Sequence, residues 1–137
     1  MAWALLGRAL APWDALFTVD SGGIGMHAKE GGLMSLDARL ALKDAGLELS
    51  EDTFLSKDLR RHPEIVLGAD LILTMTGEQK ELLLGVFENL DPSKVQTWLG
   101  FANEEGDIED PCGKGTEGAR ACLMTLQRTL PRVVEHL

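Results

Sequence analysis

The 137-residue sequence predicts an α/β protein with a doubly wound parallel sheet, and two observations lead to this fold class. Segments in which apolar residues recur at helical spacing alternate along the chain with short β-prone runs. One run, residues 70–75, is almost continuously apolar, as in a strand that a parallel sheet buries on both faces. Right-handed crossovers between such strands make the sheet parallel, and ligands bind beyond the carboxyl ends of the strands. The loops expected there are residues 21–25, 75–77 and 100–115.

The first half of the chain predicts two helices and one strand. Apolar residues at helical spacing in residues 2–10 predict a helix that ends before Pro12. Residues 16–20 are β-prone and a Ser-Gly-Gly turn follows them, which predicts a strand. Ser35 is suited to cap a helix that runs to residue 45, because its hydroxyl accepts a hydrogen bond from a free backbone N–H. Gly46 is suited to the left-handed conformation that follows a helix.

The second half predicts the remaining elements of an alternating fold. A weaker helical stretch, residues 56–67, leads into the strand at 70–75. Thr76 and Gln79 form a capping-box pattern for the next helix. Residues 95–99 predict a third strand, and Pro131 bends or ends the last helix. The expected buried faces are Leu82, Leu83, Val86 and Phe87 on the former helix, and Ala119, Cys122, Leu123, Leu126 and Leu130 on the latter.

Composition and charge indicate a single globular domain and exclude some classes of partner. Apolar residues make up 45% and charged residues 26%, which is typical of one globular domain, residues 1–137. Acidic residues outnumber basic ones 22 to 13, for a net charge of −9, which argues against nucleic acid or an anionic membrane as partner. No signal peptide or membrane span is expected, and the two cysteines are expected to be free thiols in the cytoplasm. The spacing of His27, His62 and His136 suggests no metal site, and no cofactor is expected.

The segment between Phe101 and Glu117 carries six acidic residues and one lysine, and it contains the first candidate for chemistry. Asp110 differs from its neighbours because Pro111 fixes the backbone after it. An aspartate held above the strand ends can act as a general acid, although an Asp-Pro pair is also a common turn signal. In the same loops, Ser21 with its two following glycines resembles the start of a phosphate cradle, without completing a known pattern.

The order of these segments resembles the low-molecular-weight protein tyrosine phosphatase family, and in some respects its bacterial branch that includes protein arginine phosphatases. The matching stretches are residues 19–22, 36–39, 45–47 and 69–76, the Asp110-Pro111 pair, and residues 1–6, which look like the family's Met-Ala-Glu-Ala-Leu-Leu. The family hydrolyses phosphoproteins through a phosphocysteine. The resemblance implies that Asp110 is the general acid, that Pro111 and Cys112 belong to the substrate loop, and that Ser21 supports the phosphate loop.

The sequence departs from the family pattern at the nucleophile. In the family, a strand and a Cys-x5-Arg-Ser-Pro loop precede Met-Ala-Glu, and neither is found before Met1. Cys122 and Arg128 have the loop's spacing but lie in a predicted helix, where backbone amides are not free to hold phosphate. A family histidine expected near Glu51 or Asp52 is absent. We therefore expect a domain that lacks the first strand and phosphate loop of its family.

Three functional hypotheses follow. The leading one is a phosphatase-family domain that acts on phosphotyrosine or phosphoarginine proteins only with a complete site, and is inactive as the 137 residues stand. The second is a non-catalytic domain that binds a partner, or itself, through an open sheet edge. The third is a redox role for Cys112 and Cys122. Cys122 lies on the apolar face of a predicted helix, which indicates a buried, inert thiol and argues against this role.

Overall fold

The computed structural model describes residues 1–50 and 53–137. The position near Glu51 or Asp52, where the family has a histidine, therefore lies outside the described residues. Short 3-10 turns at Ala11–Trp13, Leu59–Arg61 and Pro92–Lys94 accompany the regular elements. In chain order these elements are α1 (Ala2–Leu10), α2 (Leu36–Asp44), α3 (Pro63–Leu67), β1 (Ile72–Thr74), α4 (Gly77–Val86), β2 (Val95–Thr97), α5 (Trp98–Phe101) and α6 (Gly115–His136). No helix within residues 1–50 or 53–137 combines the length and the apolar character that a membrane span needs.

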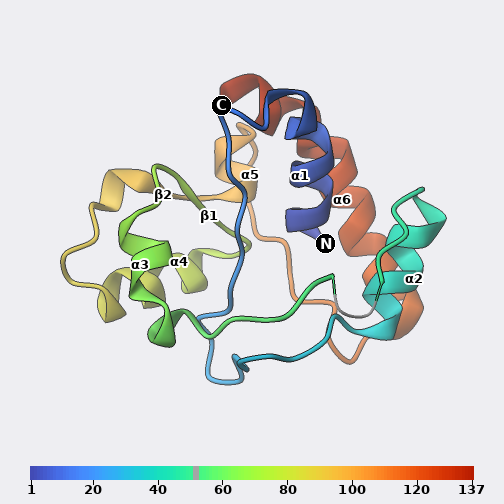
Figure 1. The fold of residues 1–137 in the computed structure, drawn as a ribbon, viewed down its shortest axis with the longest axis horizontal. Coiled ribbons are helices and arrows are strands. Elements are labelled where there is room, and N and C mark those ends of the chain that lie inside the picture. Colours follow the sequence, from blue (N-terminus) through green and yellow to red (C-terminus); the bar gives the residue numbers. More distant parts are fainter. Residues whose placement is uncertain (51–52) are drawn as a thin grey trace.

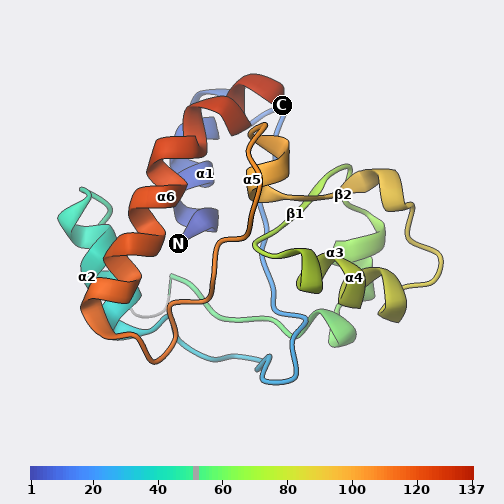
Figure 2. The ribbon, with the colours of Figure 1, turned by 180° about the vertical axis from the view of Figure 1, so that it is seen from behind.

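The sheet is parallel, as predicted, and small. Among the described residues it consists of β1 and β2, with Ile72 opposite Val95 and Thr74 opposite Thr97. Successive side chains of β1 point to opposite faces, so Leu73 packs against one hydrophobic core and Ile72 against another. Helices α1, α2, α5 and α6 form the first core, and α3 and α4 cover the other face (Figures 1 and 2). The α/β class is therefore confirmed.

The strand predicted at residues 16–20 is not formed. The chain runs alongside the sheet there without entering a ladder (Figure 1), and Leu16 is 77% exposed. A strand requires a neighbour that takes up its backbone hydrogen bonds. Here the carbonyl of Val19 accepts instead from the indole Nε1 of Trp3, at 3.2 Å.

Several helix ends follow the predicted capping chemistry. The Ser35 hydroxyl accepts from the Ala38 N–H at 3.2 Å, and Gly46 adopts φ +86° just beyond α2. The Thr76 hydroxyl accepts from the Gln79 N–H at 3.1 Å at the start of α4. The Gln79 side chain returns to the Met75 N–H, at 2.9 Å, one residue before the position that a capping box would use.

Two predicted elements are divided differently in the structure. The helix expected over residues 56–67 is a 3-10 turn followed by α3, because His62 leaves helical geometry before Pro63, which occupies the first position of α3. The strand expected over 95–99 ends at Thr97, whose hydroxyl accepts from the Gly100 N–H at 3.0 Å and caps α5.

The buried faces of the last two long helices also need correction. On α4 only Leu83 is buried, whereas Leu82 and Val86 are 37% and 39% exposed, because the narrow sheet covers little of the helix. On α6 the buried residues are Ala119, Leu123, Leu126, Thr129 and Val133. The helix continues through Pro131 to His136, so this proline does not end it.

Candidate active site

The loop between α5 and α6, residues 102–114, carries Asp110 and is called the acid loop because of its carboxylates. It is fixed to the carboxyl end of β1. Ile108 is 4% exposed and packs in the first core. Its N–H donates to the carbonyl of Met75, directly after β1, at 2.8 Å. The Asp107 carboxylate accepts from the Gly77 N–H at the start of α4, at 2.9 Å. The loop therefore lies where ligands bind in parallel α/β sheets.

The other side of the loop is fixed to α2 and α6. The Thr116 hydroxyl donates to the Asp37 carboxylate of α2 at 3.0 Å, and Lys114 pairs with Glu109 at 2.9 Å. Where the loop leaves α5, Arg128 of α6 donates to both oxygens of the Glu104 carboxylate, at 2.6 and 3.0 Å. This hydrogen-bonded guanidinium lowers the pKa of Glu104. Two of the loop's carboxylates, Glu104 and Glu109, are therefore paired with cations.

Asp110 lies between these two attachments and is exposed. Its Oδ1 accepts from the Cys112 N–H at 2.9 Å, across Pro111. Gly113 then turns the chain with φ +77°, and the Lys114 N–H donates to the Pro111 carbonyl at 3.0 Å. The hydrogen bond at Oδ1 orients the carboxyl group and leaves Oδ2 as the oxygen able to carry or accept a proton.

Ser21 lies in a second hollow, of about 220 Å³, which Trp3, Phe54 and Lys57 also line and Asp110 does not. The Trp3 and Phe54 rings lie 5.5 Å apart between centroids. Burial opposes ionisation of the neighbouring Asp20, but its hydrogen bond with Lys57, at 2.7 Å, lowers the pKa of this carboxyl. The amino end of α1 faces the same end of the molecule as the Asp110 loop and residues 53–58 (Figures 1 and 2).

Neither cysteine lies in a phosphate-binding loop. Both are free thiols, Cys112 exposed in the acid loop and Cys122 half-buried on α6. Burial raises the pKa of the Cys122 thiol, the Met1 ammonium opposes the shift, and the Asp110 carboxylate adds to it. Arg128, six residues further along the same helix, is held by Glu104. A protonated thiol on a helix is a poor nucleophile, so Cys122 is unsuited to the family's nucleophilic role.

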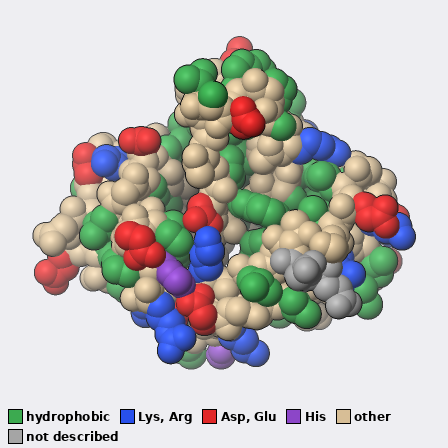
Figure 3. Space-filling view, viewed as in Figure 1, with side chains coloured by type: hydrophobic (Ala, Val, Ile, Leu, Met, Phe, Trp, Pro, Cys, Tyr) green, Lys and Arg blue, Asp and Glu red, His purple; other side chains and the backbone are tan. Residues whose placement is uncertain are grey.

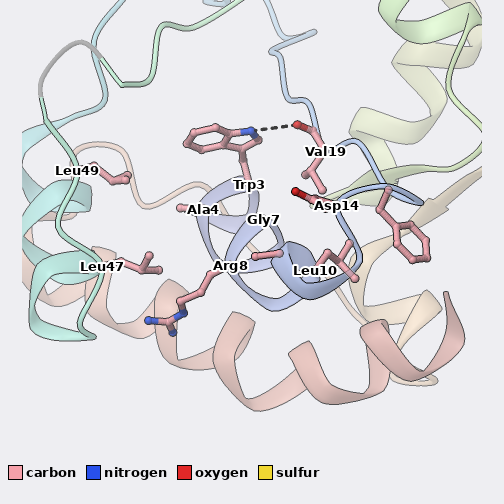
Figure 4. A pocket seen from close by; sticks show the side chains of 11 residues that line it. Trp3, Ala4, Gly7, Arg8, Leu10, Asp14, Val19, Leu47 and Leu49 are labelled. Atoms are coloured by element: carbon pink, nitrogen blue, oxygen red, sulfur yellow. Dashed lines mark hydrogen bonds between the residues drawn. The ribbon is translucent and has the colours of Figure 1, made fainter.

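Another hollow is apolar and is not lined by Asp110. It has a volume of about 360 Å³ and opens between α1, residues 14–19 and residues 47–49. Trp3 extends across it toward Val19, with Leu47 and Leu49 on the opposite wall (Figure 4). Among residues 1–50 and 53–137, no three His, Cys, Asp or Glu side chains cluster as metal ligands would.

The contacts that hold the acid loop were not predicted from the sequence. Asp37 and Thr116 lie 79 residues apart, and Asp107 and Gly77 lie 30 apart. Local patterns give no sign of such pairs. Asp107 is one of several carboxylates in residues 104–110, and no local pattern marks it out, so only the fold distinguishes it.

The fold and this loop define an α/β protein that holds an aspartate at the carboxyl end of a parallel sheet. The sequence model described as "Low molecular weight phosphotyrosine protein phosphatase" matches residues 1–137, so the chain belongs to that family. The chain is 28% identical to a protein-arginine-phosphatase of Geobacillus stearothermophilus over 137 residues, which cover 100% of this chain and 86% of that protein.

Solved structures agree with this membership. A low molecular weight protein tyrosine phosphatase from T. tengcongensis is 26% identical and matches with a TM-score of 0.84, over 99% of this chain and 88% of that one. The YwlE arginine phosphatase from Geobacillus stearothermophilus is 29% identical, with a TM-score of 0.78, over 98% of this chain and 80% of that one. Vibrio vulnificus Wzb in complex with benzylphosphonate is 19% identical, with a TM-score of 0.81 over 99% of this chain and 88% of that one, and so shows the same fold.

Proposed function

We propose that this chain supplies the general acid, Asp110, of a phosphoprotein phosphatase that works through a phosphocysteine. The observation that carries the proposal is the attachment of the Asp110 loop to β1 on one side and to α2 on the other. Double attachment restricts where the carboxyl group can lie, as general acid catalysis requires. The family to which the chain belongs, described as phosphotyrosine protein phosphatases, gives the reaction class.

In the proposed reaction, a cysteine thiolate attacks phosphorus while Asp110 gives its proton to the leaving oxygen or nitrogen of the substrate. The phosphocysteine is then hydrolysed by a water molecule, whose proton returns to Asp110, so that inorganic phosphate leaves and the thiolate is restored. Ser21 is proposed to support the phosphate-binding loop, and Pro111 and Cys112 to contact the substrate.

The 137 residues hold no Cys-x5-Arg sequence outside α6, so we propose that they have no turnover alone and need a strand and phosphate loop joined before Met1. Residues 1–137 are, in this proposal, a single domain of the family. Phosphoarginine is the favoured substrate, because the residue after Asp110-Pro111 is Cys112 rather than an aromatic that would flank a tyrosine ring. The similarity to a protein-arginine-phosphatase supports the same choice.

The test joins the strand and Cys-x5-Arg-Ser-Pro loop of the Geobacillus stearothermophilus protein to Met1 and compares the fusion with the chain alone. Hydrolysis of p-nitrophenyl phosphate is expected from the fusion only. Within the fusion, Asp110→Asn should lower kcat by about 10²- to 10⁴-fold, the usual contribution of a general acid. Glu105→Gln, an exposed carboxylate in the same loop, is the matched control and should leave kcat unchanged.

Turnover by purified chain alone, or a fusion in which Asp110→Asn behaves like Glu105→Gln, would contradict the proposal. The substrate is tested with the same fusion on phosphoarginine and phosphotyrosine peptides of matched sequence. A higher kcat/KM for the phosphotyrosine peptide would overturn the substrate choice and leave the role of Asp110 standing.

A second function, binding of an extended peptide, is favoured by one observation. Within the described residues β1 pairs with β2 alone, and residues 17–20 join no ladder, so the second edge of β1 is open to a further strand. We expect concentration-dependent association or capture of a strand from a partner. Sedimentation of a compact monomer that unfolds cooperatively at all concentrations would contradict this function.

A further inference from the structure

Residues 22–34 form a long loop that is tied to residues 55–62. Gly23 bridges to Asp58 and Leu33 bridges to Leu55. Between these points the Gly31 N–H donates to the Ser56 carbonyl, and the Ser56 N–H to the Gly32 carbonyl, both at 2.8 Å. The tip of the loop points away from the core, with Met26 88% exposed. Both ends of the loop are therefore fixed by backbone contacts. The position of its outer part depends on side-chain contacts as well.

The side chain at the centre of this arrangement is His62, which precedes α3. Its Nε2 lies 2.5 Å from the Glu30 carboxylate of the loop, and its Nδ1 lies 3.3 Å from the Glu64 carboxylate of α3. A neutral imidazole can donate from one nitrogen only, whereas the imidazolium donates from both. The two contacts are thus satisfied together only when the ring carries its second proton.

The other charged groups around His62 are acidic and basic side chains that pair with one another. Asp20 is close enough to interact with the ring, but Lys57 pairs with it at 2.7 Å. Arg60 donates to the Gly25 carbonyl of the loop at 3.3 Å and lies 3.9 Å from Asp58. Acidic, basic and histidine side chains gather on this part of the surface, below α3 and α4 (Figure 3). Glu30 and Glu64 are the two carboxylates in direct contact with His62.

We propose that His62 is a pH-sensitive clamp, which fastens the loop of residues 22–34 to α3 when protonated and releases its outer part when it loses that proton. The hydrogen bond with Glu30 raises the pKa of His62 most, desolvation of the ring opposes this increase, and the contact with Glu64 adds a smaller increase. The clamp is therefore complete below the ordinary histidine value of 6.5 and is lost as pH rises through the raised pKa.

Release of the clamp changes the loop without unfolding the domain. The backbone bonds of Gly31 and Ser56 remain, but they lose the side-chain contact beside them. Gly31, at φ +73°, lies in a region that glycine enters freely and that gives the loop a point about which to move. The segment around Glu30 then moves more freely at neutral to basic pH, while Arg60 still holds the Gly25 carbonyl and the Ser56 hydroxyl still holds the Lys29 carbonyl. This device does not depend on phosphatase activity.

The test uses the chain itself and NMR. Imidazole resonances are titrated in the wild type and in Glu30→Gln, Glu64→Gln and, as a control at an exposed histidine, His27→Asn. The His62 midpoint should lie above 6.5 in the wild type, fall in Glu30→Gln, fall less in Glu64→Gln and stay unchanged in His27→Asn. An equal midpoint in wild type and Glu30→Gln would overturn the clamp.

Amide hydrogen exchange tests whether the ion pair of His62 and Glu30 also holds the loop in place. Protection factors of Gly31 and Ser56, relative to the Ala102 amide of α5, are compared at about pH 5.5 and about pH 8, on either side of an ordinary histidine pKa. In the wild type the relative protection should fall by a factor of about two to five at the higher pH, the range that exposed ion pairs allow. Glu30→Gln should abolish this dependence. A pH-independent ratio in the wild type would refute the proposal.

Discussion

Truncation of Ile108 to alanine tests whether the core positions the candidate acid. The side chain is 4% exposed and belongs to the first core, two residues before Asp110. The change removes three carbons, a transfer loss of about 2.4 kcal/mol at roughly 0.8 kcal/mol per buried methylene. The cavity left behind adds to this loss, and comparable isoleucine truncations cost about 2–5 kcal/mol. We expect a loss of about 3 kcal/mol in the free energy of unfolding.

Urea unfolding followed by tryptophan fluorescence measures this loss. With an m-value of about 2 kcal/mol per molar, the midpoint should fall by about 1.5 M. Ile108→Val, which keeps most of the side chain, should cost about 1 kcal/mol. Leu16→Ala, at a side chain 77% exposed, should cost less than about 0.5 kcal/mol.

If Ile108→Ala costs no more than Leu16→Ala, the loop is not seated in the core. The attachment that places Asp110 at the end of β1 would then rest on the hydrogen bonds of Ile108 and Asp107 alone, and the reasoning for a positioned acid would fail.

Two further predictions concern a buried hydrogen bond and an acid-sensitive pair. Thr129→Val should lower the free energy of unfolding by about 1–3 kcal/mol, because the buried Trp98 Nε1 loses its acceptor at 2.7 Å, whereas Thr129→Ser should retain that bond. Arg128 lowers the pKa of Glu104, so this carboxylate stabilises the fold above its ordinary value of 4.5, and the contribution is lost as pH falls through the lowered pKa. Glu104→Gln should flatten the acid limb of stability against pH; an unchanged limb would contradict the pairing.

The elements that the sequence predicted well are those with local causes. Ser35 caps α2 and Thr76 caps α4 through hydroxyl groups that lie three residues from their donors. The apolar run that contains β1 needs both faces covered, and the structure covers both. Capping and burial patterns of this kind are contained within a few neighbouring residues, so periodicity and residue type are sufficient to find them.

The strand predicted at residues 16–20 fails because of a partner far away in the sequence. Residues 16–20 have strand propensity, yet the carbonyl of Val19 is taken by the side chain of Trp3. Tertiary context overrides propensity there. Trp98 is different: it is β-prone by type, and the local Thr97 cap, which accepts from the Gly100 N–H, makes it the first residue of α5. Similarly, the Asp110-Pro111 pair suggested the site, while its attachments through Met75 and Asp37 are visible only in the fold.

The two cores on opposite faces of β1 and β2 have a consequence for cooperativity. We expect each core to open as a unit of its own, since domains unfold locally in contiguous blocks. The acid loop crosses between them: Ile108 packs in the core of α1, α2, α5 and α6, while Asp107 holds the first residue of α4 on the other side. The loop therefore joins the two units, and we expect Asp110 to be held in place only while both units are closed. A partner that holds one unit against the other is expected to hold Asp110 in place as well.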